Sequence, residues 1–206
     1  MKQPRTAIFW GSIALAAIFW AVIFGLKIVN FWAGMAIASV SLAALSMRDA
    51  GIPLSRRDIS LKNLFWGAAA AVVLYAIFAA GNWLSRLLFD FAGPELSGIY
   101  AIGEQGNIWV IALVLLCITS PAEEIFWRGF VQRWCQCKAG GFAGWILGGL
   151  FYAGVHIASC NLMLTLAALV AGLFWGFIYW RTKNLFICIV SHAFWTVAAF
   201  VLWPFN

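Results

Sequence analysis

Residues 107–131 read NIWVIALVLLCITSPAEEIFWRGFV, and this stretch decides the fold class. A helix that crosses a bilayer needs about 20 mostly apolar residues, and this run is long enough. It nevertheless contains Glu123, Glu124 and Arg128 close together. The stretch therefore predicts a transmembrane helix that carries ionisable side chains within the membrane.

The composition of the whole chain agrees with a membrane location. Of the 206 residues, 65% are hydrophobic and 10% are charged, whereas soluble domains have roughly 45–50% apolar and about 25% charged residues. A soluble protein this apolar could not cover its surface, so a soluble globular class is excluded. The basic residues lie between apolar segments, so we interpret the net charge of +6 as a topology signal rather than nucleic-acid binding.

The apolar segments outside this stretch predict six more spans. They cover residues 7–25, 28–47, 62–81, 142–159, 161–180 and 184–203. The first run is too long for the core of a signal peptide, so we interpret it as a retained helix. The fold class is all-α: a polytopic membrane bundle of about seven transmembrane helices in a single domain, 1–206. Residues 82–106 form a long loop, in which Trp83 to Phe91 suggest a short interfacial helix.

Lysine and arginine are distributed unequally between the two sides of this seven-span arrangement. With the N-terminus in the cytoplasm, 11 of them are on the inner side and two, Lys27 and Arg86, are outside. The inner set is Lys2, Arg5, Arg48, Arg56, Arg57, Lys62, Arg128, Arg133, Lys138, Arg181 and Lys183. Cytoplasmic loops carry such an excess, so we expect a cytoplasmic N-terminus. The short chain and short loops suggest a bacterial inner membrane.

Ionisable residues inside spans are costly, at about 2.5–3.5 kcal/mol each, and are functional candidates by default. This chain has Glu123, Glu124 and Arg128, together with its only two histidines, His156 and His192. Glu124 and Arg128 are four residues apart and share a helix face, so they can pair. Glu123 lies about 100° round the helix and is left available for chemistry.

Whether these groups meet depends on their depth, at about 1.5 Å per helical residue. Glu123 would lie roughly 15 Å and His192 about 12 Å from the cytoplasmic surface. His156 would be about 21 Å deep if its span starts at Phe142, and would approach the others only if residues 142–145 lie outside the hydrocarbon. The three side chains can converge, but spacing alone does not require it.

Such a cluster suggests hydrolysis. A carboxylate and a histidine can take a proton from water and deliver hydroxide to a carbonyl carbon. A second histidine, with a hydroxyl or amide one turn further on, could stabilise the oxyanion. Alternatively, Glu123, His156 and His192 could hold Zn²⁺ with an open position. The H-E-x-x-H pattern of many zinc proteases is absent from the sequence.

Three short patterns resemble a known family. Glu123 to Arg128 matches E-E-x-x-x-R, Tyr152 to His156 resembles F-x-x-x-H, and His192 to Thr196 resembles H-x-x-x-N. In this order on membrane helices, they are similar to the CPBP family of CAAX proteases and bacteriocin-processing enzymes, which includes the type II CAAX prenyl endopeptidases. The resemblance covers roughly residues 107–203, which we expect to form the catalytic region.

The resemblance implies an intramembrane endopeptidase with a cavity open to the cytoplasm. Glu123 would activate water with help from His156, Glu124 and Arg128 would support the site, and His192 would contribute to the oxyanion hole. Tyr152 replaces the family's phenylalanine, and Thr196 replaces its usual asparagine. If that asparagine is needed, activity would fall by about 10²–10³.

Several alternatives stay open at this point. The chemistry is either glutamate-driven, with no cofactor, or Zn²⁺-dependent. The substrate would be a membrane-bound protein or peptide: a prenylated CAAX protein, a bacteriocin or a C-terminal sorting tail. The replacement at Thr196 keeps open a non-catalytic immunity or partner-binding protein on the same scaffold. A proton-coupled transporter is disfavoured because the ionisable cluster lies in one half of the chain and no inverted repeat is visible.

Overall fold

The computed structural model describes residues 3–205, and every regular element among them is helical. Seven helices are long and apolar enough to cross a membrane, as predicted. They cover Thr6–Leu26, Phe31–Ala50, Leu61–Leu88, Ile108–Ala139, Gly141–Ser159, Leu162–Thr182 and Leu185–Leu202. Lys2, one of the basic residues used to predict the topology, lies outside the described residues.

Several spans consist of consecutive helical segments of different winding. Span one is α1 (Thr6–Trp20) and the π-helical η1 (Ala21–Leu26), span two is α2 (Phe31–Ala50) and span three is α3 (Leu61–Leu88). Span four is α5 (Ile108–Val114), η3 (Leu115–Thr119), α6 (Ser120–Phe126), η4 (Trp127–Gln132) and α7 (Arg133–Ala139). Spans five to seven are α8 (Gly141–His156) with η5 (Ile157–Ser159), α9 (Leu162–Thr182), and α10 (Leu185–Val197) with η6 (Ala198–Leu202).

The loop between spans three and four differs from the expectation. The predicted interfacial helix from Trp83 to Phe91 is wrong, because α3 continues without interruption to Leu88. A separate short helix, α4 (Ala92–Tyr100), follows and runs into the 3₁₀ turn η2 (Ala101–Gln105). Pro94 lies in the first turn of α4, where a missing N–H is tolerated, so Gly93-Pro94 begins a helix instead of breaking one.

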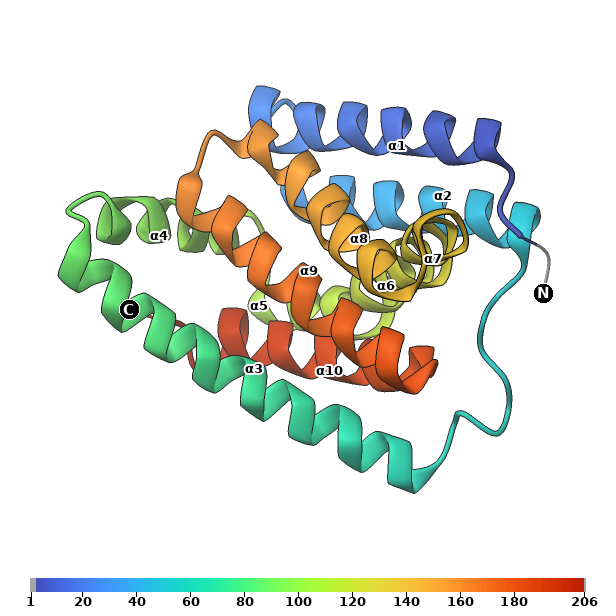
Figure 1. Cartoon of the computed structure of the whole chain (residues 1–206). Coiled ribbons are helices and arrows are strands. Elements are labelled where there is room, and N and C mark those ends of the chain that lie inside the picture. The colour runs from blue at the N-terminus through green and yellow to red at the C-terminus, as the bar shows by residue number, and fades with distance from the viewer. Residues whose placement is uncertain (1–2, 206) are drawn as a thin grey trace.

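Glycines allow the second half of the bundle to pack closely. Gly149 of α8 is so near α9 that a Cβ there would come within 2.7 Å of Leu173 Cδ2. Gly148 faces η4, where a Cβ would lie 2.9 Å from Gln132 Cβ. Small residues permit such close approach between membrane helices. Figure 1 shows α8 and α9 crossing the bundle above α10, with α3 along its outer side.

The bundle has two chemically different ends (Figure 1). We call one the basic end: it holds the start of α1 and the connections 51–60, 139–141 and 182–185. Here Arg5 pairs with Asp49, Arg133 donates to Ala50 O (3.0 Å) and Asn184 lies 3.5 Å from Asp58 Oδ1. The other, which we call the α4 end, holds the connections 27–30, 89–107 and 157–161 and the C-terminal residues.

Candidate active site

Span four is the element that places the acidic pair, and its winding is irregular there. The short helix α6 carries Glu123 and Glu124 and is flanked on both sides by the π-helical turns η3 and η4. Pro121 lies in the first turn of α6, where the wider winding before it accommodates the missing N–H. Single π-helical turns are frequent at functional sites because they redirect side chains. Both glutamates are buried as a result.

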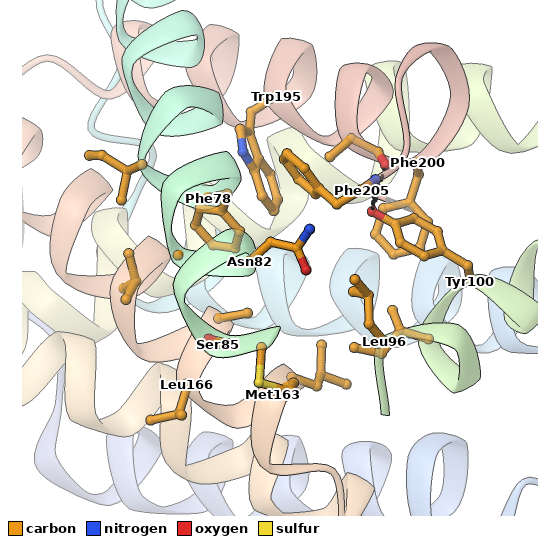
Figure 2. A pocket seen from close by; sticks show the side chains of 17 residues that line it. Phe78, Asn82, Ser85, Leu96, Tyr100, Met163, Leu166, Trp195, Phe200 and Phe205 are labelled. Atoms are coloured by element: carbon orange, nitrogen blue, oxygen red, sulfur yellow. Dashed lines mark hydrogen bonds between the residues drawn. The ribbon is translucent and has the colours of Figure 1, made fainter. Parts of the chain in front are cut away.

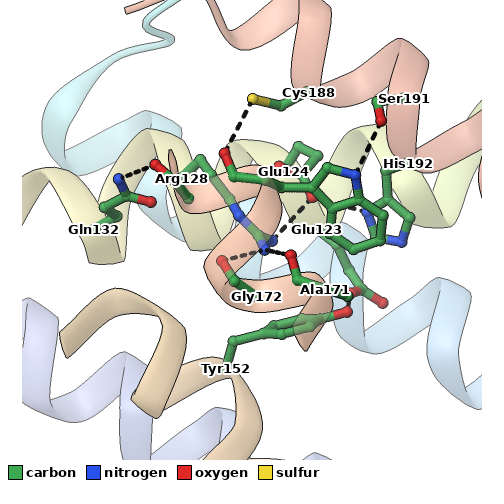
Figure 3. Close-up of polar contacts among 12 residues, drawn as sticks. Glu123, Glu124, Arg128, Gln132, Tyr152, Ala171, Gly172, Cys188, Ser191 and His192 are labelled. Carbon is green, nitrogen blue, oxygen red and sulfur yellow. Dashed lines mark hydrogen bonds and ion pairs between the residues drawn. The ribbon is translucent and has the colours of Figure 1, made fainter. Parts of the chain in front are cut away.

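Glu124 is the centre of a buried ionic network, shown in Figure 3. Its Oε1 accepts hydrogen bonds from Arg128 Nη1 (2.9 Å) and from His192 Nδ1 (2.8 Å). The guanidinium of Arg128 also donates to Gly172 O (3.3 Å) and lies 4.8 Å from the ring centre of Tyr152. Glu124 therefore accepts hydrogen bonds from Arg128 and from His192, and so orients the His192 ring. The contact with Arg128 is the one that their i,i+4 spacing predicts.

Glu123 is separate from this pair and makes a different contact. Its Oε2 accepts a hydrogen bond from the hydroxyl of Tyr152 on α8, at 3.1 Å. The phenol hydroxyl exists only because tyrosine stands where the F-x-x-x-H pattern has phenylalanine. Tyr152 therefore holds the carboxylate that we expect to act on water.

Both ring nitrogens of His156 are occupied. Its Nδ1 lies 2.8 Å from Tyr152 O, a pure acceptor, so Nδ1 carries a proton and donates it. Its Nε2 lies 3.2 Å from the indole Nε1 of Trp20, a pure donor, so Nε2 is the acceptor. In this arrangement the lone pair of His156 points at Trp20 of α1, and Trp20 must move before His156 can receive a proton from water.

His192 is held from two directions. Its ring stacks on Trp175 of α9 with centroids 3.9 Å apart, and Trp175 Nε1 in turn donates to Ser191 Oγ at 3.1 Å. One turn on, the hydroxyl of Thr196 donates to the carbonyl of His192 at 2.7 Å. The hydrogen of Thr196 is therefore used within its own helix instead of being presented to a substrate.

The candidate groups meet at one cavity of about 120 Å³. Four predicted residues line it, namely Glu123, His156, His192 and Thr196, while Glu124 and Arg128 lie behind its wall. His156 reaches this cavity from the last turn of α8, whose first turn exposes Phe142. The structure thus brings together the side chains whose convergence spacing alone left open.

A second cavity of about 220 Å³ adjoins the first and is almost wholly apolar (Figure 2). It lies between α3, α4, α9 and α10. Five residues line both cavities: Ile99, Leu164, Ala167, Trp195 and Phe200. The polar cavity and the apolar cavity therefore share a wall made of these five side chains.

The residues do not fit the zinc site considered above. Among residues 3–205, no three His, Cys, Asp or Glu side chains lie close enough to hold a metal ion. His156 also has no free nitrogen, since one is a donor to Tyr152 O and the other accepts from Trp20. A catalytic zinc needs about three protein ligands, so we derive no step through a metal.

Two site residues had no signal in the spacing of ionisable groups. Trp20 is fully buried and contacts His156 from α1, a span with no motif, and Trp175 contacts His192 from α9. The chain contains 13 tryptophans, and only tertiary structure distinguishes these two from the rest.

Comparison with known proteins gives one match. Residues 105–198 match the family model described as Type II CAAX prenyl endopeptidase Rce1-like. In the same comparisons, no curated protein and no solved structure matches the chain. The matched segment contains Glu123, Glu124, Arg128, Tyr152, His156, Trp175, His192 and Thr196. The part of the chain that supplies the glutamates, the histidines and most of their supporting side chains is therefore similar to the type II CAAX prenyl endopeptidases.

Proposed function

We propose that this protein is an intramembrane endopeptidase that hydrolyses a peptide bond of a membrane-associated protein or peptide. The observation that carries the proposal is the meeting of Glu123, His156 and His192, from three different spans, at one largely apolar cavity. Ionisable groups in the membrane are expensive, and a cavity that collects them from separate helices indicates chemistry. The Rce1-like match supports the same reaction class.

In the proposed mechanism Glu123 is the general base. Its carboxylate takes a proton from a water molecule while the water oxygen bonds to the carbonyl carbon of the substrate, and the C=O π bond becomes an oxyanion. Protonated Glu123 then gives this proton to the leaving amide nitrogen as the C–N bond breaks. The Tyr152 hydroxyl, which donates to Glu123 Oε2, fixes the carboxylate in position for both transfers.

His192 is the proposed oxyanion donor. Its Nδ1–H is committed to Glu124, so Nε2 is the nitrogen available to the cavity. Nε2 can donate to an oxyanion only when the ring is protonated on both nitrogens, and the resulting cation would lie against the Glu124 carboxylate. Arg128 and Glu124 are thus positioning residues, which act through His192 and through the wall of the cavity.

His156 has a conditional role in this mechanism. With Trp20 in place it is a neutral ring with no free acceptor. When the indole rotates away, Nε2 can orient the attacking water beside Glu123. No cofactor is required for these steps, and residues 107–203 supply all of the proposed catalytic groups.

A second function is favoured by two contacts. Trp20 occupies His156 Nε2, and Thr196 is bonded to its own helix. A scaffold with both contacts permanently in place would bind a membrane partner without cleaving it, as an immunity or partner-binding protein would. The two functions differ in whether a shortened product is formed.

The test is cleavage in the membrane. The protein is co-expressed with the membrane proteins encoded beside its gene, and the mass of each candidate is measured by mass spectrometry. We expect a shortened product with the wild type and its loss with Glu123→Gln, since a general base contributes about 10²–10⁴ in rate. His156→Ala should also reduce cleavage.

The matched control is Glu104→Gln, the same change at an exposed glutamate of η2 outside the cavity. It should cleave like the wild type. Equal cleavage by Glu123→Gln would overturn the role of Glu123. Candidates that co-purify uncleaved with the wild type and with Glu123→Gln would identify the partner-binding function instead.

A further inference from the structure

The two ends of the bundle differ strongly in charge. Nine lysine and arginine side chains of the described residues lie at the basic end, and two, Lys27 and Arg86, at the α4 end. The nine are Arg5, Arg48, Arg56, Arg57, Lys62, Arg133, Lys138, Arg181 and Lys183. Arg128 counts at neither end, because it is buried against Glu124. All of the connections concerned are short, which is the case in which lysine and arginine govern orientation.

The catalytic cavity extends from the middle of the bundle, at Glu123, Trp175 and His192, toward the α4 end. Five of its lining residues lie toward the α4 end. They are Phe24 and Phe31, on either side of the connection 27–30, and Ile99 of α4, Ile102 of η2 and Phe200 of η6. Within the described part of the chain, the nine basic residues and the connections of the basic end contribute nothing to its lining.

The cavity adjoins a surface hollow at the α4 end. This hollow, of about 280 Å³, shares Phe24, Phe31, Ile99, Ile102 and Leu164 with it. Polar groups that belong to the surface also line this hollow: Lys27, Gln105, Ser159 and Asn161. The route from bulk solvent to Glu123 and His192 therefore starts at the α4 end.

The opposite route, from the basic end, is filled with side chains. Arg128 and Glu124 lie directly behind the cavity wall and are fully buried. Further toward the basic end, Gln132 is also buried and donates to Gly176 O at 2.8 Å, which joins η4 to α9. Phe130 and Val131 are buried in the same turn. This packed layer separates the cavity from the basic loops.

We propose that the catalytic cavity opens to the extracytoplasmic side of the membrane, because the basic end faces the cytoplasm. The two expectations from the sequence, a cytoplasmic N-terminus and a cavity open to the cytoplasm, cannot both hold in this structure. The charge distribution decides for the first. If the protein cleaves peptide bonds as proposed above, its substrate presents an apolar segment outside the cytoplasm, rather than a prenylated cytoplasmic C-terminus.

Native cysteines at both ends provide a matched test. Cys160 follows η5 at the α4 end, Cys137 lies in α7 at the basic end, and both are exposed. Two variants each retain one of them, with the other four cysteines changed to alanine. A membrane-impermeant maleimide is added to intact spheroplasts and, separately, to lysed membranes. We expect Cys160 to react in intact spheroplasts and Cys137 to react only after lysis.

Reaction of Cys137 but not Cys160 in intact spheroplasts would overturn the proposal, as would reaction of both, which would mean mixed orientation. Because the cysteine changes at the buried Cys135 and Cys188 could impair folding, a second measurement uses the natural sequence. Alkaline phosphatase is fused after the last residue, beside Phe205, which bonds to Tyr100 at the α4 end. We expect this fusion to have phosphatase activity. A second fusion places green fluorescent protein at the same position. An inactive phosphatase fusion together with a fluorescent green-fluorescent-protein fusion would contradict the proposal.

A third variant tests the opening of the cavity itself. Ile102 lines both the cavity and the outer hollow. In a cysteine-free background, Ile102→Cys should react with the impermeant reagent in intact spheroplasts, and reaction only after lysis would contradict an external opening. These labelling results do not depend on catalysis, so their failure leaves the proposed peptidase untouched, and loss of cleavage in the Glu123→Gln experiment leaves the orientation untouched.

Discussion

At the scale of single residues, Thr196 has its hydroxyl hydrogen directed at the carbonyl of His192, 2.7 Å away. An asparagine at this position has a longer side chain, whose amide N–H can point into the cavity and donate a hydrogen bond to the oxyanion. We therefore expect Thr196→Asn to raise the cleavage rate, up to the factor of about 10²–10³ that one oxyanion donor supplies. The rate constant of cleavage, measured at saturating substrate, checks this.

The control at the same position is Thr196→Val, which keeps the shape and removes only the hydroxyl. It should cleave at close to the wild-type rate, because the lost hydrogen bond lies within the helix. A fall of about 10² or more with valine would mean that the Thr196 hydroxyl turns toward the substrate in the transition state.

Trp20 is the second residue whose contact controls chemistry. Removing its indole N–H with Trp20→Phe leaves His156 Nε2 without a donor and opens it to reagents from the cavity. We expect several-fold faster modification of His156 by diethyl pyrocarbonate, measured by mass spectrometry of the modified peptide. Trp127→Phe is the control, since Trp127 is equally buried, packs against Trp20 and has no partner for its own N–H among the described residues.

Faster modification in both variants would attribute the effect to loosened packing, and an unchanged rate in Trp20→Phe would show that the indole does not shield His156. The same substitution separates the two candidate functions. Cleavage that rises in Trp20→Phe indicates an enzyme in which the indole restrains the histidine.

At the scale of helices, α8 depends on its glycines. A Cβ at Gly144 would meet the backbone of α7, with Cys135 C only 2.7 Å away, whereas a Cβ at Gly154 of the same helix would meet nothing within 4 Å. We expect Gly144→Ala to destabilise the protein by about 1–3 kcal/mol, as overpacking does. Gly154→Ala should be neutral or stabilising by up to about 1 kcal/mol, since alanine favours helix. Thermal unfolding of the two variants in detergent measures the difference.

Hydropathy alone was sufficient to predict the seven spans, because each is long and few charges interrupt it. The same reasoning failed at the loop between spans three and four. The residues Trp83 to Leu88 are amphipathic enough to suggest a separate surface helix, but no breaker separates them from α3. The π-helical turns on either side of α6 had no sequence signal beyond Pro121.

At the scale of the whole molecule, some contacts of the candidate site were predictable from local spacing and others were not. The contact of Glu124 with Arg128 follows from their spacing on one helix, and the separation of Glu123 from that contact follows from the helical repeat. The contacts of Trp20 with His156 and of Trp175 with His192 join spans far apart in the sequence. No local pattern encodes them.

The position of the cavity is also a property of the whole bundle. The count of lysine and arginine concerns the loops at the helix ends, whereas the motif spacing concerns residues in the middle of the helices. Only the packed structure shows that the motif-bearing cavity extends from the middle of the bundle toward the α4 end, away from the basic loops. The expectation about the cytoplasmic loops and the expectation about the cavity therefore rest on different parts of the sequence, and the labelling experiments proposed above test them together.

The pairing of Glu124 with Arg128 also has a consequence for biogenesis. Each charge in a helix that leaves the translocon costs about 2.5–3.5 kcal/mol. Because the two side chains are four residues apart, they can neutralise one another as soon as that single helix exists, before the later helices are synthesised. Glu123 has no such local partner, and its hydrogen bond comes only with Tyr152 on the next span. The nascent chain therefore enters the lipid with Glu124 and Arg128 already paired. Glu123, the proposed general base, gains its hydrogen-bond donor only after the next span has been inserted.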